Sequence, residues 1–575
     1  MRTDSEPAGQ GAGLPLDKRP NGQLVLSGAL WNYSAAIAAS FIQLGYTAYT
    51  GRTVSAAAFG AFASALSIAQ LMGYFANAGL ANTVLCSSKL SRDLLMATLR
   101  LGMLSGILSF AVVEATAPLW AELWNAPQAG ALLRLLGCQF LVLPAAAVST
   151  AGLRRLLEQR AAVLVEIAAQ FAGLLTGALL LANGWNPMGL AAAPVATQLC
   201  VAVLAGALVA RRLPPGGGRP TGRPVCLREL AGTSGFVAAH QLAQYVTNTV
   251  PLWAVGALIG PAAAGYYSRA TLFTGLLLTM LAAGLTRVTT PALTRVRTNT
   301  LRGDGTSGSH ANEGHATHVP APQRNEPPAF RRAVTDVLLV ASALSFMPFA
   351  FLAGIGPDAL MLLLGPEWTT AARLVPLLCV FSAAALVYAV ALSVDTVCGS
   401  HRRLAVAQAT VAAVTGAGAL VAGAGDSLML MSVSALAGQL GGHAVQMWKW
   451  GENVVERRRL RVGYGVHAAL GLVLYAAGVA VSQVASGRSS PATWLMLLSV
   501  ALVAALCCLL RRHLPLYQIM AARGLFPTCR RSWGSIISGL GRGHRNPSVK
   551  FRPFPDRLRG EKPHRTGASG RSGDR

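Results

Sequence analysis

At 575 residues the chain could hold several soluble domains, but 53% of its residues are hydrophobic and only 12% are charged, against roughly 25% charged in ordinary soluble domains. Its net charge of +26 would suggest a nucleic-acid partner in a soluble protein, yet the basic residues lie mainly in loops and tails between apolar runs. No RRM-like or zinc-finger motif accompanies them, and the nine cysteines stand in no metal-binding spacing. These features predict a membrane protein with no nucleic-acid partner, metal or cofactor.

Apolar runs of about 20 residues, the length that crosses a bilayer, recur along the whole chain. They predict an all-α polytopic membrane protein with about fourteen transmembrane helices. The polar residues 1–23 form the predicted cytoplasmic N-terminal tail. The predicted spans are 24–46, 55–80, 94–117, 130–152, 161–182, 188–210, 231–258, 265–290, 333–355, 372–396, 403–424, 427–448, 463–485 and 492–510.

Three stretches between or after the spans are polar. Residues 213–230 form a predicted cytoplasmic loop, and residues 298–330, rich in Gly, Ser, Pro, Asn and His, form a predicted disordered cytoplasmic linker. The tail at 511–575 is strongly basic and is expected on the cytoplasmic side, where anionic lipid headgroups would attract it.

Lys and Arg fix the predicted orientation. The loops after even-numbered spans hold nearly all of the loop Lys and Arg, whereas those after odd-numbered spans hold only Arg52, Arg488 and the borderline Arg373. Because loops rich in Lys and Arg stay in the cytoplasm, both termini are predicted to be cytoplasmic.

A weak internal repeat divides the spans into two lobes. VSAAAFGAFASA, from Val54 to Ala65, aligns with IGPAAAGYYSRA, from Ile259 to Ala270, so that Gly60 matches Gly265. We therefore predict two six-helix lobes related by pseudo-symmetry, an N-lobe at 24–212 and a C-lobe at 231–450, with two further helices at 451–510. Secondary transporters are commonly built from such repeats, with the substrate site between them.

Several of these segments resemble a known family. NTVPLWAVGALIGPAAAGYYSRATLF, followed by TPALTR from Thr290 to Arg295, is similar to the central segment of bacterial polysaccharide flippases of the multidrug/oligosaccharidyl-lipid/polysaccharide superfamily. LLLGPEWTTAARLVPLLCVF, from Leu362 to Phe381, is similar to another segment of that family. The resemblance implies an alternating-access flippase that moves undecaprenyl-pyrophosphate-linked oligosaccharide from the inner to the outer leaflet of a bacterial cell membrane. Polymerases and glycosyltransferases of the same pathway would be its partners.

Ionisable residues within spans are costly unless they are paired or face a wet cavity. The pyrophosphate of such a substrate would suit the forked guanidinium of arginine. Arg269 is the first candidate because it follows Tyr266 and Tyr267, which are placed to stack on a sugar. Further candidates are Arg100, Arg134 and Arg373. Each arginine has an alternative role, since it can snorkel to an interface or pair with an acid.

The seventh span carries a polar stripe, formed by His240, Gln241, Gln244 and Asn248. Three of these share one helical face and are predicted to line a cavity, although hydrogen bonding between helices is an equally simple explanation. In the other lobe the matching candidates are Trp31, Asn32, Tyr33 and Gln43.

Two acids are candidates for ion coupling, namely Glu114 and Asp395. Glu114 could instead pair with Arg134, and Asp395 could be an interfacial residue near Arg402 and Arg403.

Other functions remain open from the sequence. A flippase of the lipid II type would likewise bind an anionic lipid-linked substrate. A drug or cation antiporter would instead need buried carboxylates, and the predicted spans hold fewer acids than arginines. An enzyme such as a polyprenol-sugar glycosyltransferase or polymerase is not expected, because the short outer loops hold no cluster of catalytic acids.

Overall fold

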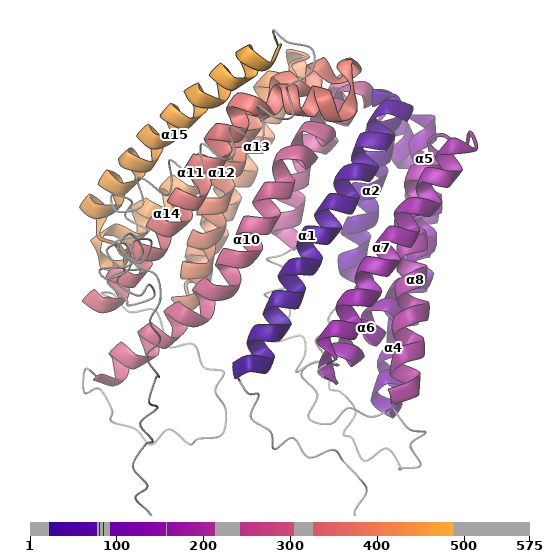
Figure 1. The fold of residues 1–575 in the computed structure, drawn as a ribbon, viewed down its shortest axis with the longest axis horizontal. Coiled ribbons are helices and arrows are strands. Elements are labelled where there is room, and N and C mark those ends of the chain that lie inside the picture. Colours follow the sequence, from indigo (N-terminus) through magenta and orange to yellow (C-terminus); the bar gives the residue numbers. More distant parts are fainter. Residues whose placement is uncertain are drawn as a thin grey trace, which may run out of the picture. The chain divides into compact units, whose positions relative to one another are not determined.

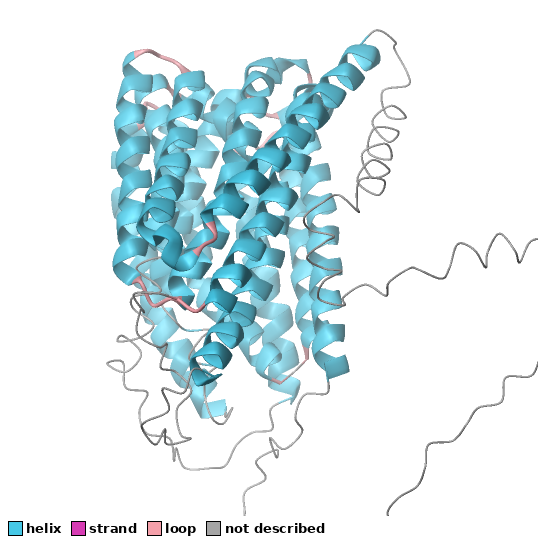
Figure 2. Cartoon of the chain, turned by 90° about the vertical axis from the view of Figure 1, so that its left-hand side faces the viewer, coloured by secondary structure: helices cyan, strands magenta, loops and turns pink. Residues whose placement is uncertain are grey.

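The fold comes from a computed structural model, which describes residues 22–77, 80, 84, 92–156, 158–212, 242–303 and 326–486. Within these residues every regular element is a helix, as predicted (Figure 2). Ten of the described helices are long and apolar enough to cross a membrane, or eleven if one bent pair forms a single span. The predicted total of about fourteen is not confirmed, and the last predicted span, 492–510, lies outside the described residues, as do the 213–230 loop and the 511–575 tail.

The N-lobe contains seven labelled helices (Figure 1). They are α1 (Gly22–Thr53), α2 (Ala56–Asn77), α4 (Arg92–Leu123), α5 (Pro127–Gly137), α6 (Leu143–Arg155), α7 (Gln159–Ala182) and α8 (Met188–Arg212).

One predicted span of the N-lobe, 130–152, is broken. It consists of α5 and α6, which meet at an angle of 43° around a short 3-10 turn, Cys138–Leu141. Pro144 stands in the first turn of α6, where its missing N–H interrupts the hydrogen bonding of a continuous helix. The apolar run gave the position of the span but not its bend.

The C-lobe begins with a helix over 242–254, which continues into a π-helical turn, Val255–Ile259. It goes on with α10 (Pro261–Gly303), α11 (Pro328–Leu364), α12 (Thr369–Val397), α13 (His401–Ala424) and α14 (Leu428–Val454). α10 stays helical beyond residue 298, where the linker was predicted to begin, because Arg297 anchors its last turns, as described below. Residues 304–325 of that linker lie outside the described part.

α15 (Arg457–Ser486) follows the C-lobe and packs along α11. The two backbones approach closely at Gly354 and Gly478, where an added Cβ on Gly354 would lie 2.7 Å from the carbonyl oxygen of Tyr475. Small residues allow such contact between membrane helices. A buried hydrogen bond of 2.8 Å joins Ser342 Oγ of α11 to His467 Nδ1 of α15.

The two ends of the helices differ in chemistry. We call one end the Trp368 end; it holds the turns around residues 54–55, 183–187, 260 and 365–368. The other, which we call the basic end, holds most of the ion pairs, including Arg154–Glu166 at 2.6 Å and Arg459–Asp336 at 2.8 Å. The distribution of Lys and Arg among the loops predicts that the basic end is cytoplasmic.

Candidate functional site

A cavity of about 660 Å³ lies between the two lobes, within the size range of small-ligand sites. Its walls come from α1, α2, α7 and α8 of the N-lobe and from residues 245–252 and α10 of the C-lobe. On α2 the lining runs from Phe59 to Gln70, and on α10 from Tyr267 to Thr279. The cavity therefore starts close to the Trp368 end and extends toward the middle of the bundle.

Arg269 of α10 is the one charged side chain among the described lining residues. Only 6% of the residue is exposed, and its guanidinium carbon lies 3.4 Å from the centroid of the Phe59 ring, across the lobe interface. Its Nη2 donates to Thr50 Oγ1 at 3.3 Å, but its Nε has no hydrogen-bond partner. No carboxylate of the described chain forms an ion pair with it. A buried cation with an unused donor is costly, and an anionic ligand would offset that cost.

A second unused polar atom lies on the same cavity. The hydroxyl of Tyr46 on α1 is buried without a hydrogen-bond partner, and Tyr46 lines the cavity together with Arg269. A phenol and a guanidinium can both donate hydrogen bonds to one oxyanion. The two lobes thus each supply one unused donor to the cavity.

The rest of the lining is uncharged, and it is mostly apolar with scattered polar side chains. Tyr245 Oη donates to the carbonyl of Ser67 at 2.7 Å and lies 3.3 Å from Gln70 Oε1, so it links the lobes across the cavity. No Asp, Glu or Lys occurs among the described lining residues. The amides and other polar groups are Gln43, Gln70, Gln170, Gln198, Asn248, Thr197, Thr249, Ser67, Ser268, Thr271 and Thr279.

The lobes are joined at the Trp368 end. Trp368 Nε1 donates to the carbonyl of Gly51 at 2.7 Å, and its ring makes edge contacts with Phe59 at 5.7 Å and Tyr266 at 5.8 Å. Arg52 Nη2 donates to the carbonyl of Leu362 at 2.8 Å. Phe59 contacts both Trp368 and Arg269, so the joined region lies next to the arginine.

The sequence candidates divide into two groups. Arg269, Tyr267, Asn248 and Gln43 line the cavity, whereas Tyr266 contacts the joining Trp368. Gln244 lies on the helix over 242–254 but outside the cavity lining. His240 and Gln241 lie outside the described residues, as do the side chains of Trp31, Asn32 and Tyr33.

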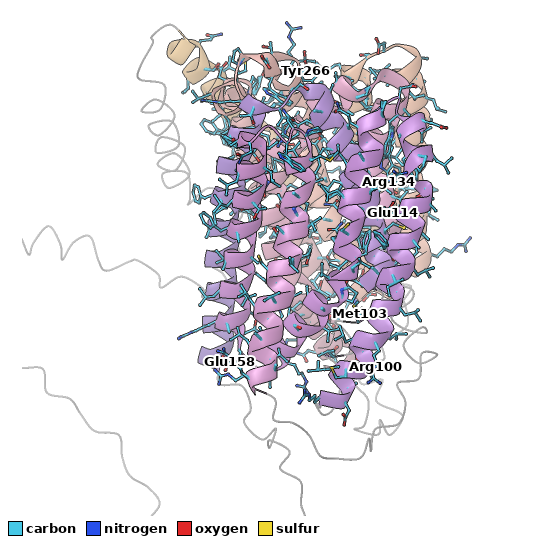
Figure 3. The ribbon with its side chains drawn as sticks, turned by 90° about the vertical axis from the view of Figure 1, so that its right-hand side faces the viewer. Arg100, Met103, Glu114, Arg134, Glu158 and Tyr266 are labelled. Atoms are coloured by element: carbon cyan, nitrogen blue, oxygen red, sulfur yellow. The ribbon has the colours of Figure 1, made fainter. Side chains whose placement is uncertain are left out.

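The other three arginines lie away from the cavity. Arg100 and Arg373 are exposed and absent from its lining. Arg134 of α5 pairs with Glu114 of α4 at 3.5 Å, and both side chains are partly exposed on the outside of the N-lobe (Figure 3). The alternative role given to these two residues from the sequence, mutual pairing, is thus the one that the geometry displays.

Asp395 of α12 is buried in the C-lobe and is not among the residues that line the cavity. Trp450 Nε1 donates to its Oδ1 at 2.7 Å, Gln446 Nε2 donates to its Oδ2 at 3.1 Å, and Arg403 Nε lies 3.9 Å from Oδ1. These partners come from α13 and α14, so the carboxylate ties three helices together.

Sequence reasoning missed several lining residues, notably Tyr46, Phe59, Gln70, Gln170 and Gln198. The three glutamines are isolated amides within apolar runs, and this feature could have marked them, because a buried amide needs partners. The two aromatics gave no such signal, since aromatic residues are common in any apolar span.

Comparison with known proteins supports the architecture. Residues 51–303 match the family model of polysaccharide biosynthesis proteins, which confirms the resemblance found in the sequence. No curated protein matches the chain in sequence. The fold is similar to that of the lipid II flippase MurJ in its inward closed conformation, with a TM-score of 0.60 and 9% identity over 85% of this chain and 99% of that one.

A multidrug resistance MATE family transporter of the MOP superfamily, in its inward-facing conformation, gives a TM-score of 0.49 with 14% identity over 78% of this chain and 99% of that one.

Proposed function

We propose that this chain, which carries the pattern of the polysaccharide biosynthesis proteins over residues 51–303, is a flippase that moves a lipid-linked glycan with an anionic phosphate linkage from the inner to the outer leaflet of a bacterial cell membrane. The observation that carries the proposal is Arg269, a buried cation with an unused Nε on a cavity between two lobes. The phosphate oxygens would accept hydrogen bonds from Arg269 and from Tyr46 of the opposite lobe.

In this proposal the structure corresponds to one of two alternating states. The lobes are joined at the Trp368 end, which the basic loops predict to be the outer end. Cargo would therefore enter from the cytoplasmic side, and release would require Trp368 to part from Gly51 and Arg269 to part from Phe59. A substrate that binds both lobes shifts the balance between the states only through its different affinity for each.

The cavity chemistry argues against a cationic drug as cargo. Such a substrate would be stabilised by a carboxylate, but none occurs among the described lining residues, and Arg269 would repel it. A lipid II-type precursor shares the phosphate linkage, and the fold similarity to a lipid II flippase keeps it as the alternative cargo.

Deletion of the gene in its host tests the function directly. We expect lipid-linked oligosaccharide to accumulate in the inner leaflet and the matching cell-surface glycan to be lost, with both restored by the wild-type gene but not by Arg269→Gln expressed at an equal level. Accumulation of peptidoglycan precursor instead would identify the alternative cargo. If no glycolipid accumulates and no glycan is lost, the flippase proposal is wrong.

A further inference from the structure

The cavity holds a set of amides that the phosphate does not need. Gln43 of α1, Gln170 of α7 and Gln198 of α8 all belong to the N-lobe and all line the cavity. Gln170 Nε2 makes only a long contact of 3.5 Å with the carbonyl of Ala39. An amide within a membrane span is unfavourable unless its two N–H groups and its carbonyl find partners. Their common exposure to one cavity indicates that the partners are supplied by water or by cargo.

The amide group of Gln is complementary to a hydroxyl group in hydrogen bonding. The side chain of Gln offers donors and an acceptor side by side, and each sugar hydroxyl can both donate and accept. The hydroxyl groups of Thr197, next to Gln198 on α8, and of Thr271 and Thr279 on α10 extend this lining. A ring that carries several hydroxyls would therefore satisfy several of these groups at once.

The same lining has little to offer a negative charge beyond those of the phosphate linkage. Arg269 is the single cation among the described lining residues, and the phosphate linkage would occupy it. A carboxylate on the glycan would lose its water without gaining a partner of opposite charge, which is a large penalty. Sites discriminate strongly when the wrong ligand leaves a charge or polar group unpaired.

We propose that Gln43, Gln170 and Gln198 form a subsite for an uncharged, hydroxyl-rich sugar, so that the carried glycan is neutral next to its phosphate rather than acidic. This inference rests on the proposed flippase function. The three glutamines belong to the N-lobe, while Arg269 belongs to the C-lobe, so one cargo molecule would contact both lobes. Specificity for the glycan is then separable from affinity for the phosphate.

Binding to the full-length protein in lipid nanodiscs tests the subsite with three probes: undecaprenyl pyrophosphate alone, the same lipid with a neutral disaccharide, and the same lipid with a disaccharide that contains a uronic acid. We expect the neutral glycolipid to bind about tenfold more tightly than the bare lipid, as two or three net hydrogen bonds would provide. The acidic glycolipid is expected to bind about tenfold less tightly than the neutral one.

Variants separate the two parts of the site. Gln43→Leu and Gln198→Leu should each remove about a third of the sugar-dependent gain on a logarithmic scale, while affinity for the bare lipid stays within about twofold. Gln128→Leu, an exposed amide of α5 outside the lining, is the matched control and should change neither. Gln198→Lys should shift the preference toward the acidic glycolipid, a gain that a misfolded protein cannot produce.

Equal or tighter binding of the acidic glycolipid by the wild-type protein would overturn the subsite, as would equal losses for bare and sugar-bearing lipid in the Gln variants. In both cases the flippase proposal would stand, since the bare lipid still binds through Arg269. Failure of the bare lipid to bind, with no effect of Arg269→Gln on any probe, would instead overturn the flippase proposal and the subsite with it.

Discussion

Gly60 of α2 and Gly265 of α10 each lie against the backbone of the opposite helix, at the point where the two lobes meet. A Cβ on Gly60 would lie 1.7 Å from the carbonyl oxygen of Pro261, and a Cβ on Gly265 would lie 1.9 Å from that of Ala56. These are the two glycines that the internal repeat aligns. Equivalent positions of the two halves thus face one another, as expected for lobes related by a pseudo-two-fold axis.

Gly265→Val should therefore disfavour the joined arrangement at the Trp368 end, because neither backbone can yield to a side chain at that distance. We expect transport to fall at least about tenfold, a change of about 1.4 kcal/mol. Labelling of an introduced cysteine, Thr50→Cys, by a membrane-impermeant thiol reagent added from outside should become faster. Gly73→Ala on α2, where an added Cβ meets nothing within 4 Å, is the control. Unchanged labelling in Gly265→Val would show that this contact does not hold the lobes together.

Trp368 should stabilise the same arrangement through its indole N–H. Trp368→Phe keeps an aromatic ring beside Phe59 but removes the 2.7 Å hydrogen bond to Gly51, at a cost of about 0.5–1.5 kcal/mol to the joined state. Spin labels on the two lobes, measured by pulsed electron resonance, should report a larger fraction of separated lobes. Trp185→Phe, at an exposed tryptophan, should leave the distances unchanged, and an identical distribution in both variants would contradict this role.

The buried ion pair at the basic end predicts a large effect on stability. Arg297 donates to Glu326 through Nε at 3.2 Å and Nη2 at 2.9 Å, and its Nη1 donates to the carbonyl of Val397 at 2.8 Å. Both side chains of the pair are 2% exposed. Glu326→Ala leaves a buried guanidinium without its carboxylate and should lower the free energy of unfolding by about 3–5 kcal/mol.

Thermal unfolding in detergent measures this loss. Arg332→Ala removes one partner of an exposed pair with Glu456, in which the Arg332 side chain is 70% exposed, and should cost only about 0–1 kcal/mol. If Glu326→Ala and Arg332→Ala unfold at the same temperature, the buried pair does not anchor the last turns of α10 as described.

Asp395 is expected to act as a structural anchor. Asp395→Ala removes the acceptor of Trp450 Nε1 and Gln446 Nε2 and should lower the free energy of unfolding by about 2–4 kcal/mol, since two buried donors lose their partner. Transport per correctly folded molecule should respond to imposed proton and sodium gradients in the same way as in the wild-type protein. A variant of normal stability that has lost its dependence on a gradient would show that Asp395 couples transport to an ion.

The sequence predicted the positions of the helices better than it predicted the side chains of the site. Long apolar runs mark spans whatever they pack against, so described helices occur at the first thirteen predicted spans. Tertiary packing, by contrast, decides which face of a helix lines a cavity. Arg269 and Arg134 are both arginines within apolar runs, and only the fold separates a residue that faces the other lobe from one that pairs with Glu114 on the outside.

The measurement that tests the central claim most directly is flipping by purified protein in proteoliposomes. A fluorescent undecaprenyl-pyrophosphate saccharide is followed by its loss of signal to a membrane-impermeant quencher. Arg269→Gln should reduce the initial rate by about 10-fold to 100-fold, because a charge-assisted hydrogen bond contributes about 1.5–3 kcal/mol, while Arg269→Lys keeps part of the rate. A wild-type rate in Arg269→Gln, at equal reconstitution and equal thermal stability, would contradict an anionic cargo carried past this arginine.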